Sequence, residues 1–217
     1  PKGTRDFLPQ EAGLRDWACD TIKQTYREFG FTSIETPAIE NIKLLKRGEG
    51  GENLQLIFEI LKRGEKLEKA TSGNGSEADL SDLGLRFDLT VPLVRYYANN
   101  VNDLPTPFKA IQIGPVWRAE RPQKGRYRQF TQCDIDIIGQ KSHFAELDLL
   151  NASSSALLKL GIENFTLRVN DRTFLQEIAR YCEFSENSFE KVFIAIDKLD
   201  KVGIDGIVEE LANQNHD

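Results

Sequence analysis

Two strand-like runs in the middle of the chain restrict its fold most. Residues 108–117 and 127–138 have the composition and alternation of β-strands, and only the short loop 118–126 joins them. Parallel neighbours need a crossover of about a dozen residues or more, whereas antiparallel neighbours can be joined by a short loop. The pair therefore predicts an α+β fold, in which an antiparallel sheet has helices on one side, and not a doubly wound parallel sheet.

The composition indicates an ordinary folded protein. The 217 residues are 40% hydrophobic and 29% charged, which excludes collagen-like and low-complexity classes. No apolar run approaches the roughly 18 residues of a membrane span, and residues 1–6 lack the apolar stretch of a secretory signal. Three cysteines and two histidines lie far apart in the sequence, so neither a zinc site nor a disulfide framework is indicated. We expect a reducing, cytoplasmic setting.

Periodicity and end signals predict the remaining elements. Helices are expected at 14–29, 91–98, 142–160, 172–181, 186–200 and 204–213, and strands at 31–36, 85–90 and 165–169. Thr90 and Ser142 are the expected N-caps, and Gly30 and Gly161 suit positions just past a helix end. Residues 54–61 fit either a strand or a short helix, and the polar stretch 62–84 predicts a long flexible loop.

Basic charge is concentrated between Arg118 and Arg128. The segment holds five basic side chains and one acid, in a chain of net charge −6. That net charge speaks against a broad basic surface for nucleic acid, but it leaves a local basic patch open. Such a loop is either a solvated hairpin tip or a site for a polyanion, because guanidinium groups bind phosphate oxygens bidentately.

The strand after this loop has a polar face and an apolar face. Period-2 alternation places Phe130, Gln132, Asp134 and Asp136 on one side, with Thr131, Cys133, Ile135 and Ile137 on the other. Asp is depleted in strands, so the polar face is either open to water or the floor of a polar site. In the expected strand 85–90, Arg86, Asp88 and Thr90 also share a face. Carboxylates and arginines together suggest a substrate that is cationic at one end and anionic at the other, such as an amino acid plus ATP.

Four segments carry a resemblance to a known family: Lys2–Pro9, Phe31–Glu40, Leu85–Thr90 and Trp117–Gly139. The last is the longest and most specific, with Arg118-Ala119-Glu120 followed by Arg126–Asp134. Together they resemble the catalytic core of a class II aminoacyl-tRNA synthetase, most closely the histidyl-tRNA synthetase family. Residues 31–40 are similar to its motif 1 and residues 117–139 to its motif 2.

The resemblance implies roles for individual residues toward ATP. Arg118 would be catalytic, holding the α-phosphate of ATP and stabilising its charge while the histidine carboxylate attacks. Glu120 would contact the adenine amino group, and Arg126 would reach the terminal phosphates. Mg²⁺ would accompany ATP by bridging its phosphates, with no protein ligand for the metal assigned.

The resemblance also implies a set of residues for histidine. Gln132 would hydrogen-bond the imidazole. Asp136 and Asp88 would hold the α-ammonium or a ring nitrogen, with Leu89 and Thr90 beside them.

The family pattern further implies a domain division and partners. Residues 1–164 would be the catalytic core with motifs 1 and 2, and residues 165–217 would hold the end of a core strand and the start of a helical inserted domain. Motif 3 and the anticodon-binding domain are absent from these residues, so the chain resembles a truncated portion that is not expected to be fully active alone. L-histidine, ATP and tRNA(His) are the implied partners, with homodimerisation through residues 14–37 and no membrane.

Two other functions remain open on these residues. One is the synthetase-like regulatory subunit of ATP phosphoribosyltransferase, which has no need to retain Arg118, Glu120, Arg126 and Gln132 together. The other is a free-standing module that binds tRNA or a protein partner, which the net charge of −6 disfavours.

Overall fold

The computed structural model describes residues 1–47, 53–72 and 80–214. The chain divides into two compact units, Pro1–Phe165 and Thr166–Asp217. In the described ranges, no helix combines the length and the apolar character that a membrane crossing requires.

The first sheet contains the predicted hairpin. Strands β5 (Phe108–Trp117) and β6 (Gln129–Ile138) pair antiparallel along their whole length, from Phe108 opposite Ile138 to Trp117 opposite Gln129. The short strand β1 (Thr32–Ser33) adds to the other edge of β5 in parallel, which gives the order β1-β5-β6. The antiparallel pair is confirmed, and β1 makes the sheet mixed.

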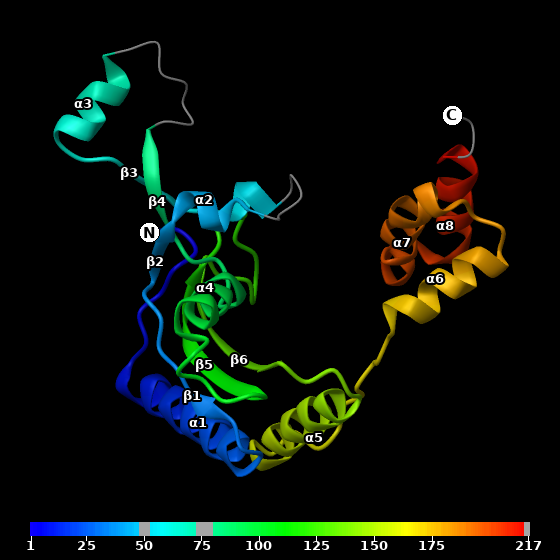
Figure 1. Ribbon diagram of the computed structural model, residues 1–217, viewed down its shortest axis with the longest axis horizontal. Coiled ribbons are helices and arrows are strands. Elements are labelled where there is room, and N and C mark those ends of the chain that lie inside the picture. The colour runs from blue at the N-terminus through cyan, green and yellow to red at the C-terminus, as the bar shows by residue number, and fades with distance from the viewer. Residues whose placement is uncertain (48–52, 73–79, 215–217) are drawn as a thin grey trace. The chain divides into compact units, whose positions relative to one another are not determined.

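Helices cover both faces of this sheet, whereas the sequence predicted one side (Figure 1). Helices α1 (Pro9–Glu28) and α5 (Phe144–Lys159) pack on the face that carries Ile111. Helix α4 (Thr90–Asn100) packs on the opposite face, where Leu93 contacts Phe108 and Ala110. The reason lies in β5 itself, whose apolar residues occur at both odd and even positions and therefore need cover on both faces.

A second, antiparallel sheet has the order β2-β4-β3. Its strands are β2 (Ile39–Asn41), β4 (Ser81–Leu85) and β3 (Glu59–Leu61). The short helix α2 (Ile42–Leu45) and the 3₁₀ turn η1 (Asn53–Leu56) accompany it. Ile42, Leu45, Ile57 and Phe87 form its apolar cluster. The ambiguous stretch 54–61 thus divides into a 3₁₀ turn and a strand.

The prediction of a long loop over residues 62–84 is wrong for those of its residues that the structure describes. Helix α3 (Glu65–Thr71) and strand β4 occupy much of it, while residues 73–79 lie outside the described ranges. Acidic Glu65 and Glu68 lie in the first turn of α3, where they favour a helix start. Strand β4 forms because it pairs with β2 and β3, which come earlier in the sequence. The polar composition of residues 62–84 gave no sign of this pairing, so the prediction from composition failed.

The predicted strand 85–90 is also wrong beyond its first residue. Strand β4 ends at Leu85, and residues 86–89 form a turn that leads into α4. The Asp88 Oδ1 atom accepts hydrogen bonds from the Thr90 and Val91 N–H groups at 3.1 and 3.4 Å. The Asp88 carboxylate therefore binds the free N–H groups at the start of α4. The sequence predicted Thr90 for this capping role, but Thr90 is the first residue of the helix.

The C-terminal ends of helices α1 and α5 agree with the glycine signals, whereas their N-terminal ends differ from the predicted starts. Gly30 and Gly161 have φ of 81° and 80°, as expected just past α1 and α5. Helix α1 begins at Pro9, earlier than predicted, because the proline suits the first turn and the Glu11 carboxylate accepts from the Leu8 N–H. Helix α5 begins at Phe144, and Ser142 is not its N-cap.

The second unit is helical. Helix α6 (Arg172–Tyr181) has the predicted bounds and is capped by the Asp171 carboxylate. The 3₁₀ turn η3 (Glu186–Ser188) precedes α7 (Phe189–Ile196), and α8 (Leu199–Gln214) is interrupted at Gly203, where φ is 71°. The strand predicted for 165–169 does not form, and these residues carry no regular secondary structure.

Candidate active site

The polar face of β6 lies on the same side of the sheet as α4. The register places Gln132 opposite Gly114, Asp134 opposite Gln112 and Asp136 opposite Ala110. Ala110 belongs to the apolar cluster under α4, whereas the alternate residues of β6 pack toward α1 and α5. The predicted division into two faces is therefore confirmed. Because Asp134 and Asp136 are half-buried, the polar face forms a floor and not an open surface.

Hydrogen-bond acceptors accumulate on this floor. The Gln132 Nε2 atom donates to Asp134 Oδ2 at 2.8 Å, while the buried Gln132 Oε1 atom has no hydrogen-bond partner among the described residues. A buried acceptor without a donor is costly, so the arrangement favours a ligand that brings N–H groups. Asp134 itself was not among the predicted site residues, although its place on the polar face was visible from the period-2 pattern.

The pKa values of the two floor carboxyls are raised. Burial is the main cause for Asp134, whose pKa rises to about 6, and the charges of Asp136 and Asp88 add to the rise while Gln132 and Arg118 oppose it. Burial is also the main cause of the raised pKa of Asp136, followed by the charge of Asp88. Three carboxyl groups thus repel one another at this place, and a bound cation would relieve the repulsion.

The turn 86–89 brings Asp88 and Leu89 to the same region. Asp88 is close enough to raise the pKa of both carboxyls on β6. The Leu89 side chain is buried, and its carbonyl oxygen accepts from Gln112 Nε2 at 3.0 Å. Thr90 is exposed at the start of α4. The structure therefore unites Asp88 with Gln132 and Asp136, while the Leu89 side chain belongs to the core.

Arg118 follows the last residue of β5 and lies beside this floor. Its Nε atom donates to the Phe87 carbonyl at 3.1 Å, and its guanidinium carbon lies 5.0 Å from the centroid of the Phe130 ring. It is also near enough to lower the pKa of Asp134. A permanent cation thus stands at one end of a carboxyl-rich surface, as a substrate with opposite charges at its two ends requires.

Glu120 and Arg126 lie in the loop between the two strands and face each other. Arg126 Nε is 3.3 Å from Glu120 Oε2, and the Glu120 carbonyl accepts from Arg128 Nε at 3.0 Å. The Arg126 side chain is 59% exposed and that of Glu120 is 20% exposed. The loop therefore keeps a basic group accessible while internal bonds hold its shape.

Arg86 is held by the core, contrary to the face predicted for strand 85–90, although its guanidinium lies over Gly114, which is opposite Gln132 in the sheet. Its side chain is buried and donates to three backbone carbonyls, those of Thr36, Pro37 and Pro115. Its Nη2 atom lies only 2.5 Å from where a Cβ on Gly114 would be. Arg86 thus joins the segment after β1 to β5, and alternation alone gave no signal of this role.

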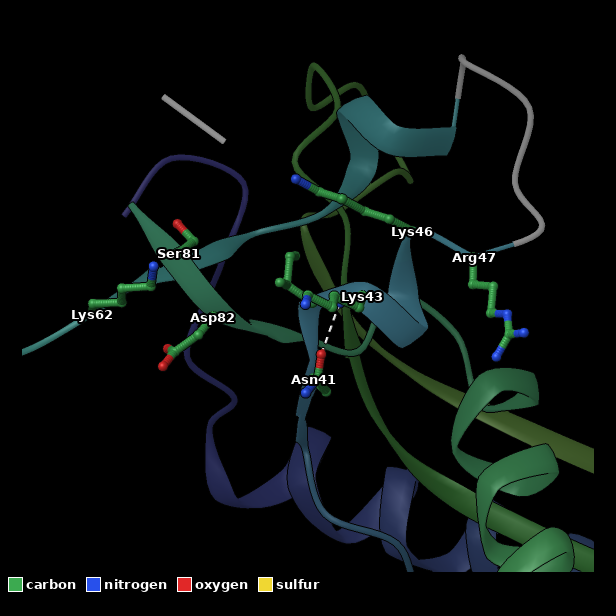
Figure 2. A pocket seen from close by; sticks show the side chains of 8 residues that line it. Asn41, Lys43, Lys46, Arg47, Lys62, Ser81 and Asp82 are labelled. Carbon is green, nitrogen blue, oxygen red and sulfur yellow. Dashed lines mark hydrogen bonds between the residues drawn. The ribbon is translucent and has the colours of Figure 1, made fainter. Parts of the chain in front are cut away.

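A separate cavity of about 670 Å³ lies beside the second sheet (Figure 2). Its lining includes four cations and one acid: Lys43, Lys46, Arg47, Lys62 and Asp82. Lys46 is paired with Glu59 at 2.5 Å, and Figure 2 shows Lys46 and Arg47 extending in different directions. The cavity shares no lining residue with the floor on β6. Within the described residues, no three His, Cys, Asp or Glu side chains come together as a metal site.

The architecture, a sheet built on the antiparallel pair β5–β6 and flanked by helices, is the class II aminoacyl-tRNA synthetase fold. The crystal structure of histidyl-tRNA synthetase from Nostoc sp. PCC 7120 superimposes with a TM-score of 0.80 at 30% identity, covering 100% of this chain and 45% of that one. Pyrrolysyl-tRNA synthetase from Desulfitobacterium hafniense shares the fold alone, at a TM-score of 0.57 and 18% identity, covering 74% of this chain and 52% of that one.

Sequence comparison narrows the class to one family. The histidyl-tRNA synthetase family model matches residues 3–217. The histidine–tRNA ligase of Leifsonia xyli subsp. xyli is 48% identical over 214 residues, 98% of this chain and 50% of that protein. The probable histidine–tRNA ligase of Tropheryma whipplei is 47% identical over 97% of this chain and 49% of its own length. The chain belongs to the histidyl-tRNA synthetase family, and it spans about half the length of the curated relatives it matches.

Proposed function

We propose that the protein is a histidine–tRNA ligase, which activates L-histidine with ATP and transfers it to tRNA(His). The observation that carries the proposal is the acceptor-rich floor on β6, with Arg118 at its end. A zwitterionic amino acid and a nucleoside triphosphate together match this charge distribution. Family membership supports the same reaction.

The carboxyl-rich end would bind histidine. The Gln132 Oε1 atom, which has no partner in the described ranges, can accept an N–H of the imidazole. Asp136 with Asp88 can bind the α-ammonium or a ring nitrogen. Thr90 lies at the start of α4 beside Asp88, and Leu89 contributes backbone and not its buried side chain. A cation at this place lowers the mutual repulsion of the carboxylates, so ammonium binding is favourable.

The basic end would bind ATP. Arg118 would hold the α-phosphate and stabilise the negative charge that grows as the histidine carboxylate attacks. Arg126 would reach the terminal phosphates and Glu120 the adenine amino group, once their mutual ion pair opens. Mg²⁺ would arrive bound to the phosphates and neutralise part of their charge. This chain's own contribution is positioning and electrostatic stabilisation, without a covalent protein intermediate.

The domain division follows from the same proposal. Residues 1–164 would be the part of the catalytic core that carries motifs 1 and 2, and residues 165–217 would begin the inserted helical domain. Because the relatives are about twice as long as this chain, we expect complete adenylation to need the remainder of such a protein.

A homodimer in the cytoplasm completes the proposal. On α1, Leu14 and Trp17 are 64% and 50% exposed, within the segment 14–37 that the sequence pointed to as the interface. Burial of these two side chains against a second copy would remove apolar surface from water. Sedimentation of the full-length protein as a monomer at micromolar concentration would contradict this arrangement.

Substitution of Arg118 by Ala tests the proposed function. In the full-length protein, we expect histidine-dependent ATP–pyrophosphate exchange to fall by roughly 100-fold or more, the scale for losing one preorganised donor. Arg63→Ala is the control, because Arg63 is exposed and lies outside the basic segment 118–128, and its exchange rate should stay close to that of the wild type. Unchanged exchange in Arg118→Ala would contradict the assignment.

The regulatory alternative is less well supported. An ATP phosphoribosyltransferase regulatory subunit/histidyl-tRNA synthetase from Bacillus halodurans C has a TM-score of 0.61 at 23% identity, which shows a common fold alone. The relatives at 47–48% identity carry the ligase name. Arg118, Glu120, Arg126 and Gln132 are also all present, as an enzyme requires.

A further inference from the structure

Two cysteines that are distant in the sequence lie on surfaces that pack together. Cys19 belongs to α1, and Cys133 belongs to the face of β6 that also carries Ile135 and Ile137, which α1 covers. Both cysteines are half-buried, and both are free thiols. Their spacing in the sequence gave no sign that they meet, so the fold alone brings them together.

A hydrogen bond near the start of the strand fixes the register of α1 on β6. Arg15 Nη2 donates to Thr131 Oγ1 at 2.5 Å. Cys19 comes one helical turn after Arg15, an advance of about 6 Å along the helix. Cys133 comes two residues after Thr131, an advance of about 6.7 Å along the strand. The two thiols therefore lie level with each other if the helix and the strand run in the same direction.

Contacts further along α1 show that the two elements do run in the same direction. The stripe of α1 that faces the sheet continues at Ile22 and Tyr26, which lie in one apolar cluster with Ile135 and Ile137 of β6. Cys19 falls between the hydrogen bond at the start of the strand and this cluster. Its side chain therefore points toward the strand at the level of Cys133.

The electrostatics of Cys133 agree with this placement. Burial raises the pKa of the Cys133 thiol to about 12, and the next causes are the charge of Cys19 and a hydrogen bond between the two side chains. Both effects decline with distance, so the two sulfurs are close neighbours. Cys133 stays protonated at neutral pH and is a poor nucleophile, so the first reaction with an oxidant falls to Cys19.

We propose that Cys19 and Cys133 are a modification site, at which hydrogen peroxide forms a reversible disulfide that joins α1 to β6. The Cys19 sulfur first takes one oxygen from the peroxide and becomes a sulfenic acid, and the other oxygen leaves as water. The Cys133 sulfur then bonds to the Cys19 sulfur, and the sulfenic OH leaves as water with the Cys133 proton. The two thiols lose two electrons and two protons, and the peroxide is reduced to two waters.

The second step becomes easier once the first has occurred. A sulfenic acid is uncharged at neutral pH, so the contribution of the Cys19 charge to the raised pKa of Cys133 disappears. In a reducing compartment such a bond is transient, because other thiols reopen it by exchange, and bonds of this kind serve mainly as catalytic or redox-sensing groups.

The bond would restrain the strand that carries the polar floor. Gln132 and Asp134, the two neighbours of Cys133 in β6, belong to the opposite face of the strand. An S–S bond is about 2.05 Å long, so α1 and β6 must draw closer than in the thiol form. The exposed Leu14 and Trp17 lie on another side of α1 at about 100° per residue, so the thiol pair is separate from the proposed dimer interface.

Peptide mapping of the full-length protein tests the pair directly. The protein is treated with hydrogen peroxide, the excess is removed with catalase, and free thiols are blocked with N-ethylmaleimide in denaturant. Trypsin then places Cys19 in the peptide 16–23 and Cys133 in the peptide 129–141. We expect these two peptides to be linked, with a mass two hydrogen atoms below their sum, and to separate in dithiothreitol.

Two variants distinguish the pair from general oxidation. Cys182→Ser removes the exposed cysteine of the second unit and should leave the yield of linked peptides unchanged. Cys19→Ser should abolish the link, and its circular dichroism spectrum should match that of the wild type if the fold is intact.

Two results would overturn the inference. One is recovery of both peptides unlinked from the wild type at a peroxide concentration that fully oxidises Cys182. The other is a linked pair found only in the covalent dimer on a non-reducing gel, which would place the two sulfurs in different copies of the chain. Neither result involves histidine-dependent exchange, so failure of this inference is distinct from failure of the proposed function.

Discussion

The buried Arg86 side chain stabilises the backbone next to the proposed active site through hydrogen bonds to carbonyl groups. Its guanidinium donates to Pro115 O at 2.9 Å and to Thr36 O at 2.7 Å, and its own backbone carbonyl accepts from the Trp117 N–H. Phe87, the next residue, accepts from Arg118. The position of the proposed catalytic arginine therefore depends on a buried hydrogen-bond network one residue away.

Replacement of Arg86 by Met should destabilise the protein strongly. The substitution leaves the Thr36 and Pro115 carbonyls without their donor, at about 1–3 kcal/mol for each buried unpaired group. Urea unfolding measures the loss, with Arg63→Met as the control, because Arg63 is exposed. Equal midpoints for the two variants would show that Arg86 contributes no more than a surface arginine.

The raised pKa of Asp134 predicts a pH-dependent stability. Its folded value of about 6 lies above the ordinary 3.8, so the native state holds the proton more tightly between these values. Stability from this group is therefore present below about pH 4, falls as the pH rises, and is lost above about 6. Asp134→Asn should gain stability relative to the wild type between pH 5 and pH 7.5 in urea unfolding.

The control for this experiment is Asp103→Asn, at an exposed carboxylate. A stability difference for Asp134→Asn that stays constant over the pH range would contradict the assigned titration.

At the scale of elements, the predicted bounds are right where a periodic pattern extends over the whole element. They are wrong where one side chain changes the direction of the backbone. Strand β5 and helix α6 have the predicted bounds, since each carries a clear pattern over its full length. Residues 85–90 alternate like a strand, but capping by Asp88 starts α4 and ends the extended path. Asp88, a predicted site residue, therefore comes from a turn and not from a strand, while Arg86 on the same predicted face is held by the core.

Helix α6 offers a test of capping. The Asp171 carboxylate accepts from the Thr173 and Phe174 N–H groups at 2.7 and 3.3 Å. Asp171→Ala should lower the stability of the second unit by about 1 kcal/mol, with a smaller loss for Asp171→Asn, which can also cap. Thermal unfolding followed by circular dichroism measures it, and Asp205→Ala, at an exposed position in α8, is the control.

At the scale of the whole molecule, the chain consists of two units joined near residue 165. Residues 165–170 carry no regular secondary structure, and Arg168 is 82% exposed, with a surface ion pair to Asp200. Such segments are the usual sites of proteolytic cleavage.

Trypsin should therefore cut first after Arg168. Mass spectrometry of an early time point should find two fragments that meet at this residue, and Arg168→Gln should remove the cut. An initial cut within β5 or β6, at Lys109 for example, would show that the central sheet opens more readily than this segment.

The sequence by itself determined the antiparallel hairpin, the two faces of β6 and the concentration of basic charge between Arg118 and Arg128. These features depend on short-range spacing, which loop length and period-2 alternation report directly. The residues of the motif-like segments were also sufficient to indicate the family, which the comparisons confirm.

Only the tertiary structure decided which polar groups meet. It brings Asp88 to Asp134 and Asp136 and turns Arg86 toward the Thr36 carbonyl. In the part of the chain that the structure describes, it gives Gln132 Oε1 no donor. The physical reason is that buried polar groups take whatever partners the packed fold places within reach, however distant they are in the sequence. Alternation specifies a face, but the neighbours across that face follow from the packing of the whole unit.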